Sequence, residues 1–90
     1  MRYLYDEAKR TANLKKHGYD LVDAPLIIES TNALTFEDRR FDYGEQRFIT
    51  LGVLREVVVV IVTAETNEEI RVISMRKAER NEQEIYFKNR

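Results

Sequence analysis

The stretch "EVVVVIVTAE", residues 56–65, decides the fold of this 90-residue chain. It holds an unbroken run of β-branched apolar residues from Val57 to Val62, with no polar residue between them. Such a run is typical of a strand that is buried on both faces, because β-branched side chains favour extended backbone. The stretch therefore predicts the central strand of a sheet.

Further strands are predicted around this run. The segment "ALTFED" (33–38) places Leu34 and Phe36 on one side, and "QRFITLGVL" (46–54) and "EIRVISM" (69–75) flank the central stretch. Because the connections between these segments are short, neighbouring strands should run antiparallel. The sequence thus predicts a four-stranded antiparallel meander.

The segment before the meander predicts a helix with clear ends. The opening "RYLY" (2–5) is short, aromatic and β-prone. Asp6 can then cap a helix over "EAKRTANLKKH" (7–17), and Gly18 can end it in the left-handed conformation.

Two more helices complete the expected fold. A short one should begin near Asp23, with Pro25 in its first turn, where a missing N–H does no harm. Another is expected over "AERNEQEIYFKN" (78–89), anchored by Ile85. We expect the helices before and after the sheet to cover one face, giving a single α+β domain over residues 1–90.

Composition narrows the class of protein. Hydrophobic residues make up 43% of the chain and charged residues 34%, with a net charge of -1, so any electrostatic partner must be found in a local patch. There is no cysteine and one histidine, so we expect no disulfide, metal centre or cofactor. The longest apolar run is too short to cross a membrane and no signal peptide is evident, which favours a cytoplasmic protein.

Positive charge gathers where the last strand gives way to the last helix. The cations there are Arg71, Arg76, Lys77 and Arg80. In a meander, Arg47 and Arg71 would lie at the same end of the sheet, roughly 10 Å apart. Arginine forks bind phosphate oxygens, which indicates a phosphate-binding surface. The alternative is a solvated face in which Glu79, Glu82 and Glu84 pair with these cations.

Other candidate side chains also have two interpretations. His17 can act as a general acid or base, or can bind carbonyls at the helix end. Tyr43, Tyr86 and Phe87 can stack on bases, or can pack in a small core. The chain has no glycine-rich phosphate loop, nucleophile elbow or zinc spacing. These residues suit metal-independent RNA cleavage, in which the 2′-hydroxyl of the substrate attacks the adjacent phosphate.

Three stretches in order carry a resemblance to a known family. They are "YDEAKRTANLKKHGYD" (5–20), "FEDRRFDYGEQRFITLG" (36–52) and "EIRVISMRKAERNEQEIY" (69–86). Together the chain resembles the BrnT family of type II toxins, which are small ribonucleases with a RelE-like fold. The resemblance implies an RNA substrate, inhibition of translation and a neighbouring BrnA-like antitoxin of the ribbon-helix-helix class. DNA would be bound only indirectly, through the antitoxin, and no membrane would be involved.

The resemblance also implies where the ribonuclease surface lies. The block "RVISMRKA" (71–78) looks like the basic signature of the family, and "DYGE" (42–45) looks like its turn. We therefore assign the candidate catalytic residues Arg76 and Lys77, supported by Arg47 and Arg71, with the lysine or a nearby tyrosine such as Tyr86 for proton transfer. The candidate RNA-binding residues are Arg39, Arg40 and Arg80.

The chain departs from the family pattern at two positions. Phe41 stands where members often have histidine, which removes an acid–base group there. Glu79 stands where many have threonine, so a complete T-x-x-E capping box is missing. Two other functions stay open beside the ribonuclease, a non-catalytic module that docks an acidic protein and a nucleic-acid-binding regulator without catalysis.

Overall fold

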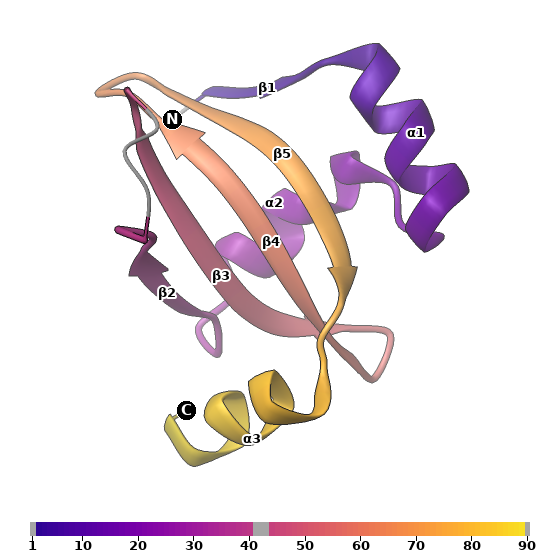
Figure 1. Ribbon diagram of the computed structural model, residues 1–90, viewed down its shortest axis with the longest axis vertical. Helices are drawn as coiled ribbons and strands as arrows, with labels where there is room; N and C mark the ends of the chain where they lie inside the picture. The colour runs from indigo at the N-terminus through magenta and orange to yellow at the C-terminus, as the bar shows by residue number, and fades with distance from the viewer. Residues whose placement is uncertain (1, 41–43, 90) are drawn as a thin grey trace.

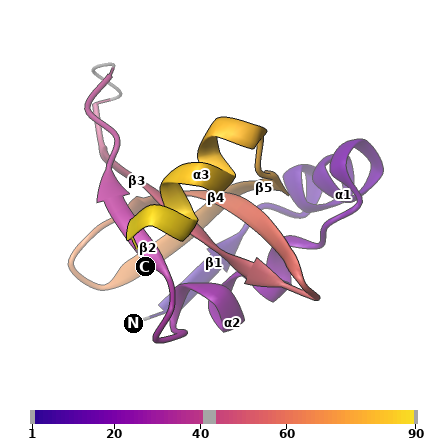
Figure 2. The same cartoon turned by 90° about the horizontal axis from the view of Figure 1, so that it is seen from below.

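The computed structural model describes residues 2–40 and 44–89 of the chain. The elements are β1 (Arg2–Tyr5), α1 (Glu7–His17), the 3₁₀ turn η1 (Leu21–Asp23), α2 (Ala24–Ile28), β2 (Leu34–Glu37), β3 (Gln46–Leu54), β4 (Val57–Glu65), β5 (Glu69–Lys77) and α3 (Arg80–Asn89). One five-stranded sheet has the order β1-β5-β4-β3-β2, and helices lie on both of its sides (Figures 1 and 2).

The central position of β4 is confirmed. The strand lies third in the sheet, and its neighbours β3 and β5 both run antiparallel to it. Val59 and Ile61 are fully buried on one face, while Val58 and Val60 are buried on the other. The β-branched run thus builds two cores at once.

The predicted meander of β2 to β5 is confirmed, but it is not the whole sheet. β1 adds a fifth strand parallel to β5, in a register that runs from Arg2 opposite Glu69 to Tyr5 opposite Val72. The purely antiparallel sheet expected from the sequence is therefore wrong at this edge. The pairing joins segments more than sixty residues apart, so it could not be predicted from a short connection between them.

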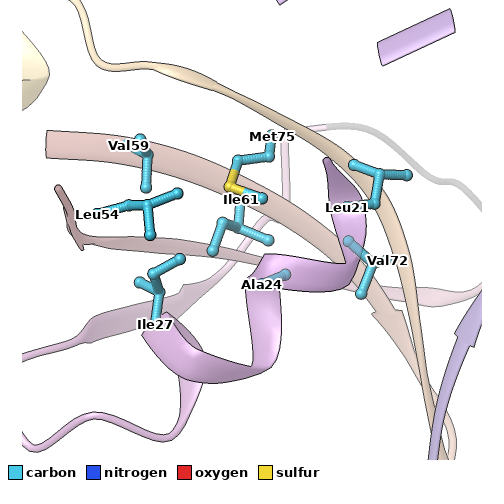
Figure 3. Packing of buried hydrophobic residues seen from close by; sticks show 8 residues of the cluster. All are labelled: Leu21, Ala24, Ile27, Leu54, Val59, Ile61, Val72 and Met75. Carbon is cyan, nitrogen blue, oxygen red and sulfur yellow. The ribbon is translucent and has the colours of Figure 1, made fainter. Parts of the chain in front are cut away.

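The expectation that all helices cover one face is also wrong. Residues of η1 and α2, among them Leu21 and Ile27, pack against one face of the sheet (Figure 3). Tyr86 of α3 packs against Leu51 and Val60 on the opposite face. The physical reason is that a strand buried on both faces needs a cover on each.

The helix ends follow the sequence closely. The Asp6 carboxylate accepts hydrogen bonds from the backbone N–H groups of Ala8 at 2.9 Å and Lys9 at 3.2 Å. Gly18 has a φ of 78°, and its N–H donates to the Leu14 carbonyl at 2.9 Å. The predicted start and stop of α1 are both confirmed.

The short second helix begins as expected, with Pro25 in its first turn. It lies close to β3 at Gly52, where an added Cβ would lie 2.2 Å from Cγ2 of Ile27. Glycine at this strand position therefore lets α2 approach the sheet.

The anchor of α3 differs from the prediction. Ile85 is 43% exposed, whereas Tyr86 is 1% exposed and fills the α3-side core. Successive helical residues are rotated by about 100°, so a small change in how a helix enters its packing site exchanges neighbouring positions.

The side chain of Asn13 ties α1 to β5. Its amide nitrogen donates to the carbonyls of Met75 and Tyr19, both at 2.9 Å. Its amide oxygen accepts from the Met75 N–H at 3.1 Å. This contact begins where β1 has ended, and it holds α1 beside the second half of β5.

Candidate functional site

Three of the candidate arginines leave the same face of the sheet. Arg47 of β3 and Arg71 of β5 both lie directly opposite Ala64 of β4, one on each side. Arg76 lies opposite Val60, which belongs to the α3-side core. Ala64 and Val60 are four residues apart on one strand and so share a face. We call this surface the arginine face. The prediction that Arg47 and Arg71 lie at one end of the sheet is confirmed.

The arginine face is long enough to contact more than one phosphate. Four residues of strand separate the Ala64 row from the Val60 row, which is roughly 13 Å. Helix α3 lies across the end of the sheet near Arg76 (Figure 1). Between the two rows the half-buried residues Ile49 and Val62 give an apolar floor.

Arg47 and Arg71 are joined by a carboxylate. Glu45 Oε1 lies 3.2 Å from Arg47 Nη2 and 2.8 Å from Arg71 Nη2, and Glu45 Oε2 lies 3.0 Å from Arg71 Nη2. We call these three residues the Glu45 cluster. This bridging role of Glu45 was not predicted from the sequence. A signal for it was present, because residues two apart, such as Glu45 and Arg47, lie on the same side of an extended chain.

Arg76 forms a two-pronged ion pair with α3. Its Nη1 and Nη2 donate to Glu82 Oε1 and Oε2, both at 2.8 Å. The hydrogen bonds from Arg76 hold the pKa of the Glu82 carboxyl below its usual range, and those to Glu82 raise the pKa of Arg76. The guanidinium is therefore charged and held in a fixed orientation at the start of α3.

Glu82 also caps the helix that carries it. Its Oε1 accepts a hydrogen bond from the Glu79 N–H at 2.8 Å, and the Glu79 carbonyl accepts from the Gln83 N–H at 2.9 Å. This is the glutamate half of a capping box, formed although threonine is absent at residue 79. The start of α3 and the orientation of Arg76 thus depend on one carboxylate.

Two arginines follow β2. Arg40 donates from Nε and Nη2 to the buried carboxylate of Asp38 at 2.9 and 3.0 Å. Its charge lowers the pKa of both Arg76 and Glu82, after the larger hydrogen-bond and burial effects, so it acts on the Arg76 end of the arginine face. Arg39 is exposed and pairs with Glu37 at 2.8 Å.

Arg80 begins α3 and extends into solvent. Its side chain is 96% exposed, and its nearest carboxylate is that of Glu84, 3.8 Å away. The solvated-face interpretation predicted that Glu79, Glu82 and Glu84 would pair with the cations of this junction; Glu82 and Glu84 do so, whereas Glu79 forms no ion pair with the described residues. Among the described arginines of the junction, Arg80 has the longest distance to its carboxylate partner.

Lys77 and Tyr86 are not brought into the arginine face. Lys77 lies opposite Val59, which belongs to the α2-side core, so strand alternation directs it away from Arg76. It lines an open hollow of about 240 Å³ at the end of the sheet. Tyr86 is a core residue whose ring meets Phe87 edge-on, with centroids 5.3 Å apart.

The remaining candidates are dispersed. His17 lies in the last turn of α1, and Phe87 is 53% exposed on α3. Tyr43, a stacking candidate, and Phe41, where family members often have histidine, lie outside the described residues.

The described residues contain neither a group of metal ligands nor a membrane-spanning helix. In residues 2–40 and 44–89, no group of three His, Cys, Asp or Glu side chains lies close enough to hold a metal ion. Within the same described residues, no helix has the length and apolar content needed to span a membrane.

The match to a protein family covers the arginine face. A family model described as "Ribonuclease toxin, BrnT, of type II toxin-antitoxin system" matches residues 5–82, a span that includes the arginine face and ends at Glu82. The match defines a toxin of the ribonuclease class that is paired with an antitoxin. The chain belongs to the BrnT family. No significant match was found among curated proteins.

Proposed function

We propose that this BrnT-family chain is a metal-independent endoribonuclease that uses the arginine face as its RNA surface. The observation that carries the proposal is the convergence of Arg47, Arg71 and Arg76 on one face, within the span matched by a ribonuclease family. Arginine forks suit phosphate oxygens, and these three are oriented by carboxylates before any substrate arrives.

The chemistry that fits this set is transesterification within the RNA. The 2′-oxygen bonds to the adjacent phosphorus as the bond from phosphorus to the 5′-oxygen breaks. Water accepts the proton of the 2′-hydroxyl and donates one to the departing 5′-oxygen, because arginine is a poor proton acceptor. Arg76 stabilises the charge on the phosphate under attack, while Arg47 and Arg71, in a row roughly 13 Å away along β4, hold another phosphate of the same RNA.

The proposal assigns different weights to the candidate residues. Arg40 supports the Arg76 end through its charge, and Arg80 and Arg39 contribute general phosphate attraction from solvent-exposed positions. Lys77 leaves the opposite face and Tyr86 is enclosed in the core, so neither is given a part in the reaction.

The family supports a proposal for the cellular role. We propose that cleavage takes place in the cytoplasm and stops translation, and that a BrnA-like ribbon-helix-helix antitoxin neutralises the toxin and binds DNA on behalf of the complex. The RelE-like fold implied by the resemblance stays a prediction.

One observation favours a second function. Every arginine of the arginine face has a carboxylate partner, which lowers the positive potential available to a polyanion. Because carboxylates already occupy the guanidinium groups that would stabilise a phosphate under attack, the pairing favours a module that binds nucleic acid or an acidic protein without catalysis.

The test is cleavage of labelled single-stranded RNA in the presence of EDTA. Arg76→Ala should lower the cleavage rate by about 10²–10³, the usual effect of losing one preorganised charge contact. Lys77→Ala is the matched control, because it removes the adjacent cation, which lies in the Val59 row and lines a hollow at the end of the sheet, and it should cleave at close to the wild-type rate.

Loss of all wild-type cleavage on addition of EDTA would contradict metal independence. Equal rates for wild type and Arg76→Ala would contradict the site and leave the binding module as the better account.

A further inference from the structure

A second positively charged region lies away from the arginine face, between α1 and β5. Because β1 pairs only with the first part of β5, the chain leaves the sheet at Tyr5 and returns alongside as α1. Asn13 then holds the helix to Met75. The helix and the strand enclose an open hollow of about 300 Å³, which we call the lysine groove.

Lys9, Lys16 and His17 line this groove, and none of the described residues that line it is acidic. Lys9 and Lys16 are seven residues apart, two turns of one helix face. Among the described residues no lysine forms an ion pair, whereas every arginine does. No ion pair within the described part of the chain therefore offsets the charge of Lys9 or Lys16, and the nearby Asp6 carboxylate accepts from the backbone N–H groups of Ala8 and Lys9.

Nearby acids are engaged elsewhere. Glu7 and Asp20 both pair with Arg10, at 3.5 and 2.7 Å. That pairing holds the pKa of Asp20 below its usual range, chiefly through hydrogen bonds from Arg10, so Asp20 stays charged and bound to its partner. An anionic partner can thus approach the lysines without competing with an internal salt bridge.

The floor of the groove decides which kind of anion fits. Ala12 and Ile73 supply aliphatic surface, and among the described lining residues there is no Phe, Tyr or Trp, the imidazole of His17 being the one ring. Proteins that bind single-stranded RNA combine positive charge with aromatic rings on which bases stack. An aliphatic floor between lysines instead suits a polypeptide that places an apolar side chain in the hollow and carboxylates at its rim.

The groove also adjoins the arginine face. Ser74 lines the groove, and it lies opposite Val62 between the Arg71 and Arg76 rows. A segment bound in the groove would therefore reach the edge of the surface that is proposed to bind RNA.

We propose that the lysine groove docks an acidic segment of the antitoxin, with one aliphatic side chain in the hollow and carboxylates at Lys9 and Lys16. This assignment rests on the proposed neutralisation by an antitoxin. The bound segment restricts access to the arginine face from the β5 side.

The test uses the full toxin chain and the purified BrnA-like antitoxin encoded beside it, with affinity measured by calorimetry at two salt concentrations. Lys9→Glu/Lys16→Glu should weaken antitoxin binding by about tenfold or more and reduce its salt dependence. Lys15→Glu is the matched control, since Lys15 is exposed on the same helix and does not line the groove. It should bind nearly as wild type.

A second variant tests the apolar contact without a change of charge. Ala12→Trp fills the hollow from an exposed helix position and should also weaken binding. Circular dichroism is used to check that each variant is folded.

RNA cleavage by the free variants separates this inference from the proposed function. Unchanged cleavage with weakened antitoxin binding is the expected result. Weakened RNA binding with unchanged antitoxin affinity would make the groove an RNA contact and overturn the assignment, as would no change in either. If wild type does not cleave RNA at all, the ribonuclease proposal fails while the antitoxin measurement still decides the groove.

Discussion

The arginine face and the lysine groove contain the same kind of charge in opposite circumstances. On the arginine face, Arg47 and Arg71 both donate to Glu45, and Arg76 donates from Nη1 and Nη2 to Glu82. In the groove, Lys9 and Lys16 have no carboxylate partner among the described residues. The guanidinium fork forms oriented pairs, whereas the compact ammonium group stays hydrated on a flexible stem. Counting cations along the sequence therefore locates the surface whose arginines are held by carboxylates. The ion pairs in the structure are needed to show which surface has cations without carboxylate partners.

The largest expected effect removes both regions together, because both depend on the sheet around β4. Val59→Asp places a carboxylate at a position with no solvent exposure, which costs several kcal/mol and should prevent folding at 37 °C. Thermal unfolding followed by circular dichroism measures this. Val53→Asp is the control on the neighbouring strand, where the side chain is 44% exposed, and it should stay folded. A cooperatively folded Val59→Asp protein would show that β4 is not interior.

An intermediate effect is expected from freeing one arginine of its partner. Glu82→Ala removes the ion pair with Arg76 and the cap on α3, and should lower the free energy of unfolding by about 1–2 kcal/mol. It should also slow RNA cleavage, because Arg76 loses its fixed orientation. Glu84→Ala removes a partner at 3.8 Å from an exposed arginine, and should change stability by less than about 0.5 kcal/mol.

The same contact predicts a dependence on pH. Because Arg76 lowers the pKa of Glu82 in the folded chain, the pairing stabilises fully above the unfolded pKa of about 4.3. That contribution is lost as the pH falls through the lower folded pKa. The stability difference between wild type and Glu82→Gln should therefore be present at pH 6 and shrink below pH 4. A constant difference would mean that Glu82 acts only as a helix cap.

The smallest effect is expected at the exposed rim of the arginine face. Arg80→Ala should weaken the binding of all RNA sequences about equally and reduce the slope of log affinity against log salt by about 1. Titrations of two unrelated RNA oligonucleotides over a range of salt concentrations measure both quantities. A sequence-dependent loss, or binding that is insensitive to salt, would contradict phosphate contact at this position.

The sequence predicted what local physics controls. The β-branched run located β4, Asp6 and Gly18 bounded α1, and short connections ordered β2 to β5. The relative position of two candidate arginines was predicted for the same reason, since strand order places Arg47 and Arg71 in one row.

Features that depend on distant packing could not be predicted. Nothing near residues 2–5 indicates that they pair with β5, and the choice of Tyr86 over Ile85 depends on how α3 enters its packing site. The bridging role of Glu45 needs β3 and β5 to be placed on either side of β4 first. The lysine groove likewise exists only because α1 is held beside a strand sixty residues later in the chain.

The Asn13 side chain has a consequence for self-association. By donating to the Met75 carbonyl and accepting from its N–H, the amide occupies the groups that a neighbouring strand would use. β5 spans nine residues, and β1 covers only the first four of them. The amide thus blocks strand addition where β1 ends, and each outermost strand, β1 or β2, has only four residues. Short edge strands are poor templates for edge-to-edge aggregation. A single amide therefore helps to keep this sheet from growing into a neighbouring molecule.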